Sequence, residues 1–167
     1  MSDTNNPSGG NGAPVPTPPQ PQQQLIINVQ YLKDFSFENP RAPQSLMPQQ
    51  TGPEIKLDIN VNAQNMAPDT FEVLLSISAR ATRKDEPVFL VELTYAGVVT
   101  LQNVTREQAP FFILVETPRL LFPFARAIVA DATRDGGFPP LYVHPIDFGE
   151  LLRRQQLAQG QPPAGTA

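Results

Sequence analysis

The feature that most constrains the fold of this chain is a strict alternation of apolar and polar side chains. In Glu54–Asn62 the sequence EIKLDINVN places an aliphatic residue at every second position. A period of two puts these aliphatic side chains on one face of an extended strand and the polar ones on the other. Thr70–Thr82 repeats the pattern, beginning with Phe71 and Val73 on its apolar face. The sequence therefore predicts two β-strands, each with one buried face.

Two further segments have the composition of strands. They are Leu25–Lys33 and Val88–Leu101, both rich in β-branched and aromatic residues. The short connections at 65–69 and 83–87 suit antiparallel hairpins. Four strands that come before any helical pattern favour an α+β domain over a doubly wound parallel sheet.

The strand predicted at Val88–Leu101 is apolar on both faces. One face begins with Phe89 and Val91, and the other places Leu90 beside Glu92. An apolar knob next to a charge has the composition of a contact surface. A strand that is apolar on both faces also indicates burial against a second layer, for example a second copy of the chain. Both interpretations stay open.

Helical patterns follow the strands. Thr105–Glu116 reads as a short, proline-interrupted helix. Thr117 then has the character of a cap, with Pro118 at the first helical position, where its missing N–H costs nothing. The helix should continue to about Arg134 and end at Gly136-Gly137, because glycine favours the conformation that terminates helices.

A last, short helix has a clear start signal. Asp147 can accept from backbone N–H groups and Glu150 can reach back, which resembles a capping box. Phe148 lies on a narrow apolar stripe that continues through Leu151 and Leu152. A helix this short needs packing to persist, so it either docks firmly or hinges as a lid.

The connection at 35–53 is long for a compact domain and contains four of the chain's 20 prolines. Connections of this length are uncommon and are often functional. Its apolar residues, including Leu46 and Met47, have to rest on something. It is either a crossover packed on the domain's own core or part of a binding surface.

The two ends of the chain differ from its centre. Residues 1–24 are rich in proline and glutamine and carry one charged side chain, Asp3, and residues 155–167 carry none. Segments with so few apolar residues cannot form a core, so both are expected to be disordered. This leaves 25–154 as one domain.

Composition excludes several classes of protein. The chain has no cysteine and a single histidine, His144, so thiolate chemistry and sites built from several histidines are excluded. The net charge is −4, with no long basic run, which argues against nucleic-acid binding. No apolar run approaches the ~20 residues of a membrane span, and the N-terminus lacks the pattern of a signal peptide, which points to a cytoplasmic location.

Motifs of catalysis are missing from the sequence. It contains no GxxxxGKS/T, GxGxxG or GxSxG pattern. The best carboxylate pairs, Asp34 with Glu38 and Asp85 with Glu86, lie in polar segments where no raised pKa is expected. The expectation is therefore a protein that is not an enzyme and that holds neither a cofactor nor a metal.

Five groups of residues resemble the bacterial SecB protein-export chaperone family in their order and spacing. The resemblance covers about 25–152, nearly the whole predicted domain. The groups are Tyr31, Lys33, Asp34, Ser36, Phe37, Glu38, Pro40, Ala42 and Pro43; Pro53, Glu54, Lys56, Leu57 and Asp58; Phe89, Leu90, Glu92 and Gly97; Leu121, Phe122, Pro123, Ala125 and Arg126; and Gly137, Phe138, Pro139, Pro145, Ile146 and Phe148.

The resemblance implies a four-stranded antiparallel sheet with two main helices, assembled as a homotetramer that is a dimer of dimers. It also implies an ATP-independent holdase. Such a protein keeps newly made precursor polypeptides unfolded and delivers them to the SecA translocase motor. No nucleic acid and no insertion into the membrane are implied.

The same resemblance implies two sets of site residues. The surface that contacts the SecA motor corresponds to Asp34, Glu38, Leu90 and Glu92. Candidates for the groove that holds unfolded clients are Phe37, Leu57, Ile59, Phe122, Phe124, Phe138, Phe148, Leu151 and Leu152. The C-terminal tail contacts the motor in the family, but here it is uncharged from 155 onward, so that role is not assigned to it. The residues alone also leave open a small-molecule-binding or regulatory α+β domain that oligomerises through its sheet.

Overall fold

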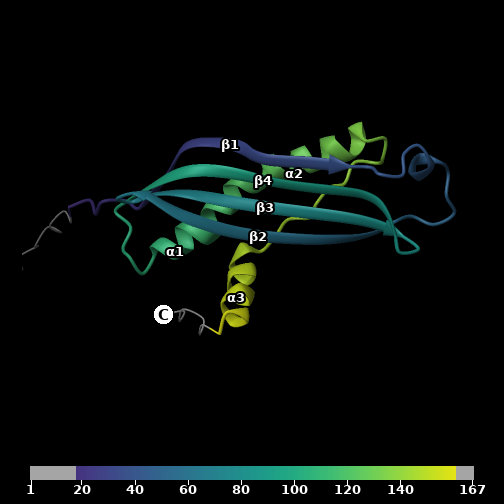
Figure 1. Ribbon diagram of the computed structural model, residues 1–167. Coiled ribbons are helices and arrows are strands. Elements are labelled where there is room, and N and C mark those ends of the chain that lie inside the picture. The colour runs from purple at the N-terminus through teal and green to yellow at the C-terminus, as the bar shows by residue number, and fades with distance from the viewer. Residues whose placement is uncertain (1–17, 161–167) are drawn as a thin grey trace, which may run out of the picture.

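A computed structural model describes residues 18–160 of the chain. Four antiparallel strands form one sheet in the order β1-β4-β3-β2, and α2 crosses one face of it (Figure 1). The strands are β1 (Gln24–Glu38), β2 (Glu54–Ala67), β3 (Thr70–Arg83) and β4 (Glu86–Gln102). The helical elements are η1 (Gln44–Leu46), α1 (Ala109–Phe111), η2 (Phe112–Glu116), α2 (Thr117–Asp135) and α3 (Phe148–Ala158). The predicted α+β class, with an antiparallel sheet of four strands and two main helices, is confirmed.

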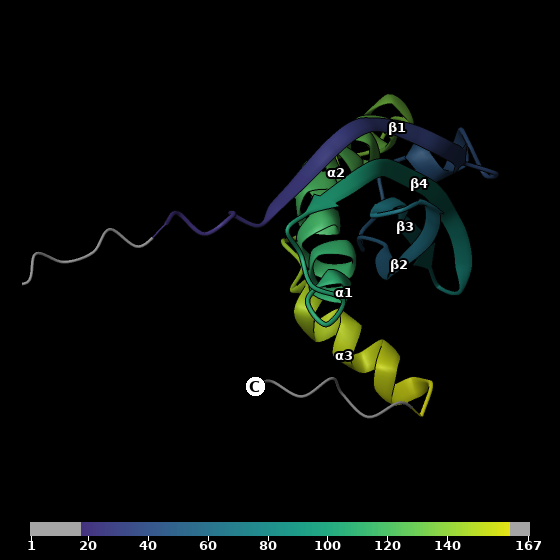
Figure 2. The same cartoon turned by 90° about the vertical axis from the view of Figure 1, so that its left-hand side faces the viewer.

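The core lies between the sheet and α2. Odd-numbered residues of β3 and β4 point toward α2 and are almost completely buried, among them Leu75 and Val91. They meet the inner face of α2, where Leu121 and Val129 are fully buried. Gly97 makes room for this helix, because a Cβ atom there would stand 3.1 Å from Leu121 Cδ2. The other face of the sheet, called the outer face below, carries no helix (Figure 2).

Strand β1 is longer than predicted and reaches Glu38. Irregularities in its register with β4, between Ile27 and Val29 and between Leu32 and Asp34, each insert one extra residue. Each insertion shifts the alternation by one position, so the apolar residues do not follow a single period of two. This is why the end of the strand was placed at Lys33, and why residues 35–38 were wrongly assigned to the connection that follows.

Both hairpins are tighter than the sequence indicated. The β3–β4 loop is only Lys84-Asp85, with φ of 50° and 63°, and the β2–β3 loop is Pro68-Asp69. Positive φ at both central residues gives a turn whose twist matches that of the strands. The predicted loops at 65–69 and 83–87 were too long, because the ends of the strands continue through residues that do not keep the apolar–polar alternation.

The predicted cap at Thr117 is wrong. The chain is helical on both sides of this residue, and η2 is a turn of π-helix. The Thr117 hydroxyl donates to the carbonyl oxygen of Phe112, 2.8 Å away and five residues back. A π-helical turn lets the helix continue into Pro118, which has no N–H to donate. The helix therefore runs without a break from α1 into α2.

The ends of α2 and α3 follow the predicted signals. Gly136 and Gly137 terminate α2, and the Phe138 N–H donates to the Thr133 carbonyl, 3.0 Å away. At the start of α3 the Asp147 side chain accepts from the Glu150 N–H at 3.0 Å. Figures 1 and 2 show α3 extending away from the sheet beyond β2.

The boundary predicted for the C-terminal tail was too early. Helix α3 continues to Ala158, and the Gln155 side-chain amide donates to Asn60 Oδ1 on β2, 2.6 Å away. This contact ties residues 155–158 to the domain although they carry no charge. Most of the expected N-terminal extension, 1–17, and the end of the tail, 161–167, lie outside the described residues.

One carboxylate on the outer face is buried. Glu72 on β3 is only 7% exposed, because Tyr31 and Lys33 of β1 reach across β4 to it. The Lys33 ammonium lies 2.6 Å from Glu72 Oε1, and the Tyr31 hydroxyl donates to the same oxygen. The hydrogen bond from Lys33, followed by that from Tyr31, lowers the pKa of Glu72 below its ordinary value. This contact links the edge strand to the centre of the sheet.

We expect the Glu72 contact to stabilise the fold in a pH-dependent way. Because the folded-state pKa is lowered, the stabilisation is fully present above the ordinary pKa of glutamate and is lost as the pH falls through the lowered folded-state pKa. Glu72→Gln should therefore lower the free energy of unfolding by about 1 kcal/mol at pH 7, with Lys33 half in solvent. Urea unfolding at fixed protein concentration measures this, with the exposed Glu54→Gln as control. A difference from the parent protein that stays constant down to pH 3 would contradict the expectation.

Candidate binding surfaces

The four residues predicted to contact the motor lie together on the outer face of the sheet. Asp34 and Glu38 belong to β1, and Leu90 and Glu92 belong to the adjacent β4. The register places Glu38 opposite Leu90, and it places Glu92 opposite Ser36, between the two acidic residues of β1. Antiparallel partners project on the same side of a sheet, so these four side chains share one surface.

The sheet adds a fifth residue to this surface. Asp58 of β2 faces Ser78, which faces Glu92, so three strands bring acidic side chains to neighbouring positions. A shallow hollow of about 320 Å³ lies between Asp34, Asp58 and Glu92. We call Asp34, Glu38, Asp58, Leu90 and Glu92 the acidic face. It can attract a positively charged partner and offers one apolar contact at Leu90.

A second surface lies at the end of the sheet where the β1–β2 connection joins the end of β1 to the start of β2. A cleft of about 520 Å³ is bounded by this connection, the start of β2 and the segment that follows α2. Its rim carries Leu46, Met47 and Ile55, each of which is between 41% and 56% exposed. Phe89 and Phe138 lie deeper in it. We call this the apolar cleft.

Three aromatic rings form a row at this end of the sheet, and two of them, Phe89 and Phe138, line the apolar cleft. The centroids of Phe37 and Phe89 are 6.2 Å apart, and those of Phe89 and Phe138 are 5.0 Å apart. The three rings come from the end of β1, the start of β4 and the segment after α2. Gly136 lies against the Phe37 end of this row. Its lack of a side chain leaves room for the ring, because a Cβ atom there would overlap the Phe37 ring.

A methyl group at Gly136 should disrupt this row. Gly136→Ala has an ordinary backbone angle, φ −73°, but its Cβ would displace the Phe37 ring from Phe89. We expect a loss of about 1–3 kcal/mol in the free energy of unfolding, as is usual for overpacking. Urea unfolding measures it. Adding Phe37→Leu should recover part of the loss by removing the ring, and no recovery would mean that the clash lies elsewhere.

A third apolar region lies between α2 and α3. Phe122 and Phe148 are buried there with ring centroids 5.9 Å apart, and a cleft of about 530 Å³ opens beside them. Leu152 lines a further cleft between α3, η2 and β2. Because Phe122 and Phe148 are only 6% and 3% exposed, both belong mainly to the core.

The nine residues predicted for the client groove are therefore distributed over several places. Phe138 lines the apolar cleft and Phe37 belongs to the aromatic row beside it, Leu57 and Ile59 lie on the helix side of β2, and four more lie around α3. Phe124 is separate: it is 49% exposed on α2 and stacks on Tyr95, 6.1 Å away. The nine residues thus form three separate groups and one single residue: Phe37 and Phe138; Leu57 and Ile59; Phe122, Phe148, Leu151 and Leu152; and Phe124.

The sequence indicated the rim of the apolar cleft only in part. Ile55 was assigned to the buried face of a strand because of its alternation, yet it is 41% exposed at the open end of β2. Leu46 and Met47 were placed in a long connection for which a binding surface was one of two alternatives. Their gathering depends on how that connection folds back, and no local pattern encodes this.

The described residues, 18–160, show no metal site and no membrane-spanning helix. No group of three or more His, Asp or Glu side chains there could hold a metal ion, and none of the described helices could cross a membrane. His144 is exposed.

Known proteins resemble this chain closely. Residues 18–159 match the family described as preprotein translocase subunit SecB. The protein-export protein SecB of Nitrobacter hamburgensis is 50% identical over 159 residues, which cover 93% of this chain and 99% of the relative. That of Rhodospirillum centenum is 55% identical over 137 residues, 81% of this chain and 82% of the relative.

A solved structure shares the fold. It is a SecB-like chaperone of Mycobacterium tuberculosis in complex with a peptide from an antitoxin, with a TM-score of 0.60 at 19% identity. The match covers 73% of this chain and 90% of that one. Fold and relatives together define a chaperone of protein export. The chain belongs to the SecB family, and the resemblance found in its sequence is confirmed.

Proposed function

We propose that this protein is an ATP-independent holdase that keeps newly made precursor proteins unfolded and delivers them to the SecA motor. It would act in the cytoplasm as a homotetramer, a dimer of dimers. The observation that carries the proposal is the apolar cleft with its exposed rim on a domain that also presents an acidic face.

The apolar cleft suits an unfolded client. An extended polypeptide has apolar side chains that gain ~25 cal/mol for each Å² that leaves water. The rim residues Leu46, Met47 and Ile55 keep about half of their surface exposed, so a client can cover them without unfolding the domain. A flexible methionine and a connection rich in proline accept many shapes, which keeps selectivity among clients low. The sequence has no nucleotide-binding motif that would make capture depend on ATP.

The acidic face suits the motor. It lies on the outer face of the sheet, opposite the helices, so a client in the apolar cleft and a partner on the acidic face need not compete. Charge complementarity favours fast encounter with a basic surface. In this proposal the motor contacts Asp34, Glu38, Leu90 and Glu92, and Asp58 extends the contact to β2.

Assembly into a tetramer would cover apolar surface that a single chain exposes. Within residues 18–160, β1 pairs with β4 alone, so its second edge is free. On this strand Val29 is 51% exposed and Leu32 is 44% exposed, and Phe124 of α2 is exposed near Leu32 and Tyr95. A long apolar edge strand is a site of association unless another chain covers it.

Lysine on this edge should therefore dissociate the assembly. For Val29→Lys with Leu32→Lys, we expect light scattering to show a mass below that of four chains of 18.3 kDa each. The parent protein should have the mass of four chains. Lysine at two exposed apolar positions elsewhere, Met66 and Leu157, is the control and should leave the mass unchanged. A monomeric parent protein would contradict the tetramer.

The holdase itself is tested by aggregation. A chemically unfolded protein is diluted into buffer without ATP, with and without stoichiometric amounts of the purified chain, and turbidity is followed. We expect suppression of aggregation and, by light scattering, a complex of one tetramer with one long client. Absence of suppression would contradict the holdase and would favour a small-molecule-binding or regulatory domain.

A further inference from the structure

Two cations on the outer face of the sheet border the acidic face. Lys56 of β2 and Arg80 of β3 are register partners, and Arg80 is also the partner of Leu90 on β4. Antiparallel partners project on the same side of a sheet, so both cations lie in the row that contains Leu90 and Glu38. Both are exposed, and no helix covers this side of the sheet (Figure 2).

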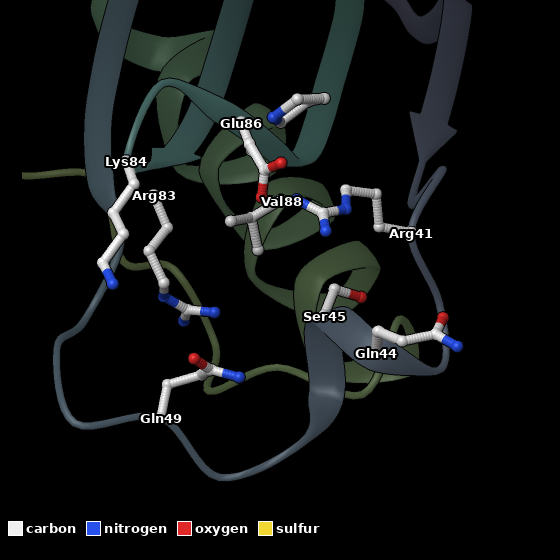
Figure 3. A pocket seen from close by; sticks show the side chains of 9 residues that line it. Arg41, Gln44, Ser45, Gln49, Arg83, Lys84, Glu86 and Val88 are labelled. Atoms are coloured by element: carbon white, nitrogen blue, oxygen red, sulfur yellow. Dashed lines mark ion pairs between the residues drawn. The ribbon is translucent and has the colours of Figure 1, made fainter.

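The pairing of Lys56 with Arg80 is unfavourable for the fold. Like charges at directly opposite positions of adjacent strands destabilise a sheet. Within residues 18–160 no ion pair neutralises either side chain. Arg41, in a recess near the same end of the sheet, is instead paired with Glu86 (Figure 3). A repulsion that the fold itself does not relieve indicates a role outside the fold.

The outer face changes sign next to these cations. Asp58 and Glu92 lie two residues along their strands from the row of Lys56 and Arg80, and Asp34 lies in the row after that. A partner that is basic throughout would meet attraction at the three carboxylates and repulsion at the two cations. A partner that also places an acidic group over the cations would be attracted at both.

Charges of opposite sign lie on one diagonal of the outer face. Asp34 of β1 pairs with Thr94, which makes Glu92 its diagonal neighbour on β4. Glu92 pairs with Ser78, which makes Arg80 its diagonal neighbour on β3. Diagonal neighbours stand about 7–8 Å apart, and two residues of an extended chain advance by about 6.6 Å. An extended segment along this diagonal can therefore face Asp34, Glu92 and Arg80 with alternate side chains.

We propose that Lys56 and Arg80 bind a carboxylate of the motor, and that the segment recognised on the acidic face carries two basic residues and then an acidic one at alternate positions. Lys56 and Arg80 are then specificity-determining residues, because they fix the direction in which the segment crosses the sheet. The inference rests on the proposed contact with the motor and names the chemistry of the contacting segment.

Removing the two cations distinguishes this inference from simple attraction of a basic partner. Lys56→Gln with Arg80→Gln makes the chain more negative, so a purely basic partner should bind more tightly. If the cations hold a carboxylate, affinity for immobilised SecA should instead fall about three- to tenfold, the range for two exposed charge contacts. Surface plasmon resonance at low, constant ionic strength measures this. Because a like-charge pair is removed, the urea midpoint should stay equal or rise, which excludes loss of the fold.

The matched control neutralises two exposed cations outside the sheet, through Arg106→Gln with Arg154→Gln, and makes the same change in net charge. Its motor affinity should equal that of the parent protein or be slightly higher. A second control, Lys56→Arg with Arg80→Lys, keeps both charges and should retain most of the affinity.

Two amidated peptides test the order of the charges. Lys-Thr-Lys-Thr-Glu matches the diagonal, whereas Lys-Thr-Glu-Thr-Lys has the same composition and places its carboxylate against Glu92. NMR titration of the full-length protein at low ionic strength follows the amide resonances of Ser78 and Thr94. We expect the first peptide to bind about two- to fivefold tighter. In Lys56→Gln with Arg80→Gln this ratio should fall toward one.

The outcomes separate this inference from the proposed function. A motor affinity that stays equal or rises when Lys56 and Arg80 are neutralised would overturn the inference, as would equal affinities of the two peptides on the parent protein. A parent protein that does not bind SecA would instead overturn the proposed motor contact itself.

Discussion

Reversing the charges of Asp34, Glu38 and Glu92 to lysine should reduce the affinity for the SecA motor by about a hundredfold or more. All three side chains are on the acidic face, on two adjacent strands. A favourable exposed charge contact contributes about 0.2–1 kcal/mol, and reversal replaces each attraction by a repulsion of similar size. Three such changes amount to about 3 kcal/mol, and 1.4 kcal/mol corresponds to a factor of ten. Binding to immobilised SecA by surface plasmon resonance measures this.

Capture of an unfolded client by the same variant should be unchanged, since the apolar cleft lies at another surface. The matched control reverses three exposed acidic residues elsewhere, Glu107, Asp131 and Asp135, with the same change in net charge. It should keep most of the motor affinity. A further check is salt: affinity of the parent protein should fall as ionic strength rises, because exposed charges are screened. Equal motor affinity for the parent and the acidic-face variant would remove the basis for the proposed contact.

The strands with a regular alternation, including the edge strand β2, were predictable from the sequence, whereas the full length of the other edge strand, β1, was not. β3 has an apolar partner on each side and a helix over one face, so its alternation is strict. β1 contains two inserted residues, and each one shifts the side that the following residues face. The Thr117-Pro118 pair has the composition of a helix start, but a π-helical turn allows the helix to run through it. Irregular hydrogen bonding of this kind leaves no periodic signal.

The two surfaces differ in how far the sequence could define them. The resemblance named four acidic-face residues, and the register of β1 with β4 brings them together; only Asp58, from β2, was not among them. The aromatic row beside the apolar cleft consists of Phe37, Phe89 and Phe138, which are far apart in the chain, and the last two line the cleft. Their contact depends on the path of the β1–β2 connection and on the end of α2. No spacing along the chain encodes it.

Replacing the rim of the apolar cleft should weaken client binding by about a hundredfold. The change is Leu46→Ser with Met47→Ser and Ile55→Ser. About half of each side chain is exposed in the free protein. Covering this exposed half with a client contributes about 1 kcal/mol per residue. Three residues together give about 3 kcal/mol, or about two factors of ten in affinity. Anisotropy of a labelled unfolded client measures it, and SecA affinity should remain that of the parent protein.

The rim is a better target than the aromatic residues of the core. Phe122 is 6% exposed, so Phe122→Ser would cost about 3–5 kcal/mol of stability. Loss of client binding could then not be distinguished from loss of the fold. Rim variants should keep the circular dichroism spectrum and the urea midpoint of the parent protein. The matched control removes the same kind of exposed apolar surface outside the cleft, through Met66→Ser, Phe111→Ser and Leu157→Ser. If rim and control variants lose client affinity equally, clients bind to exposed apolar surface in general and the apolar cleft has no special role.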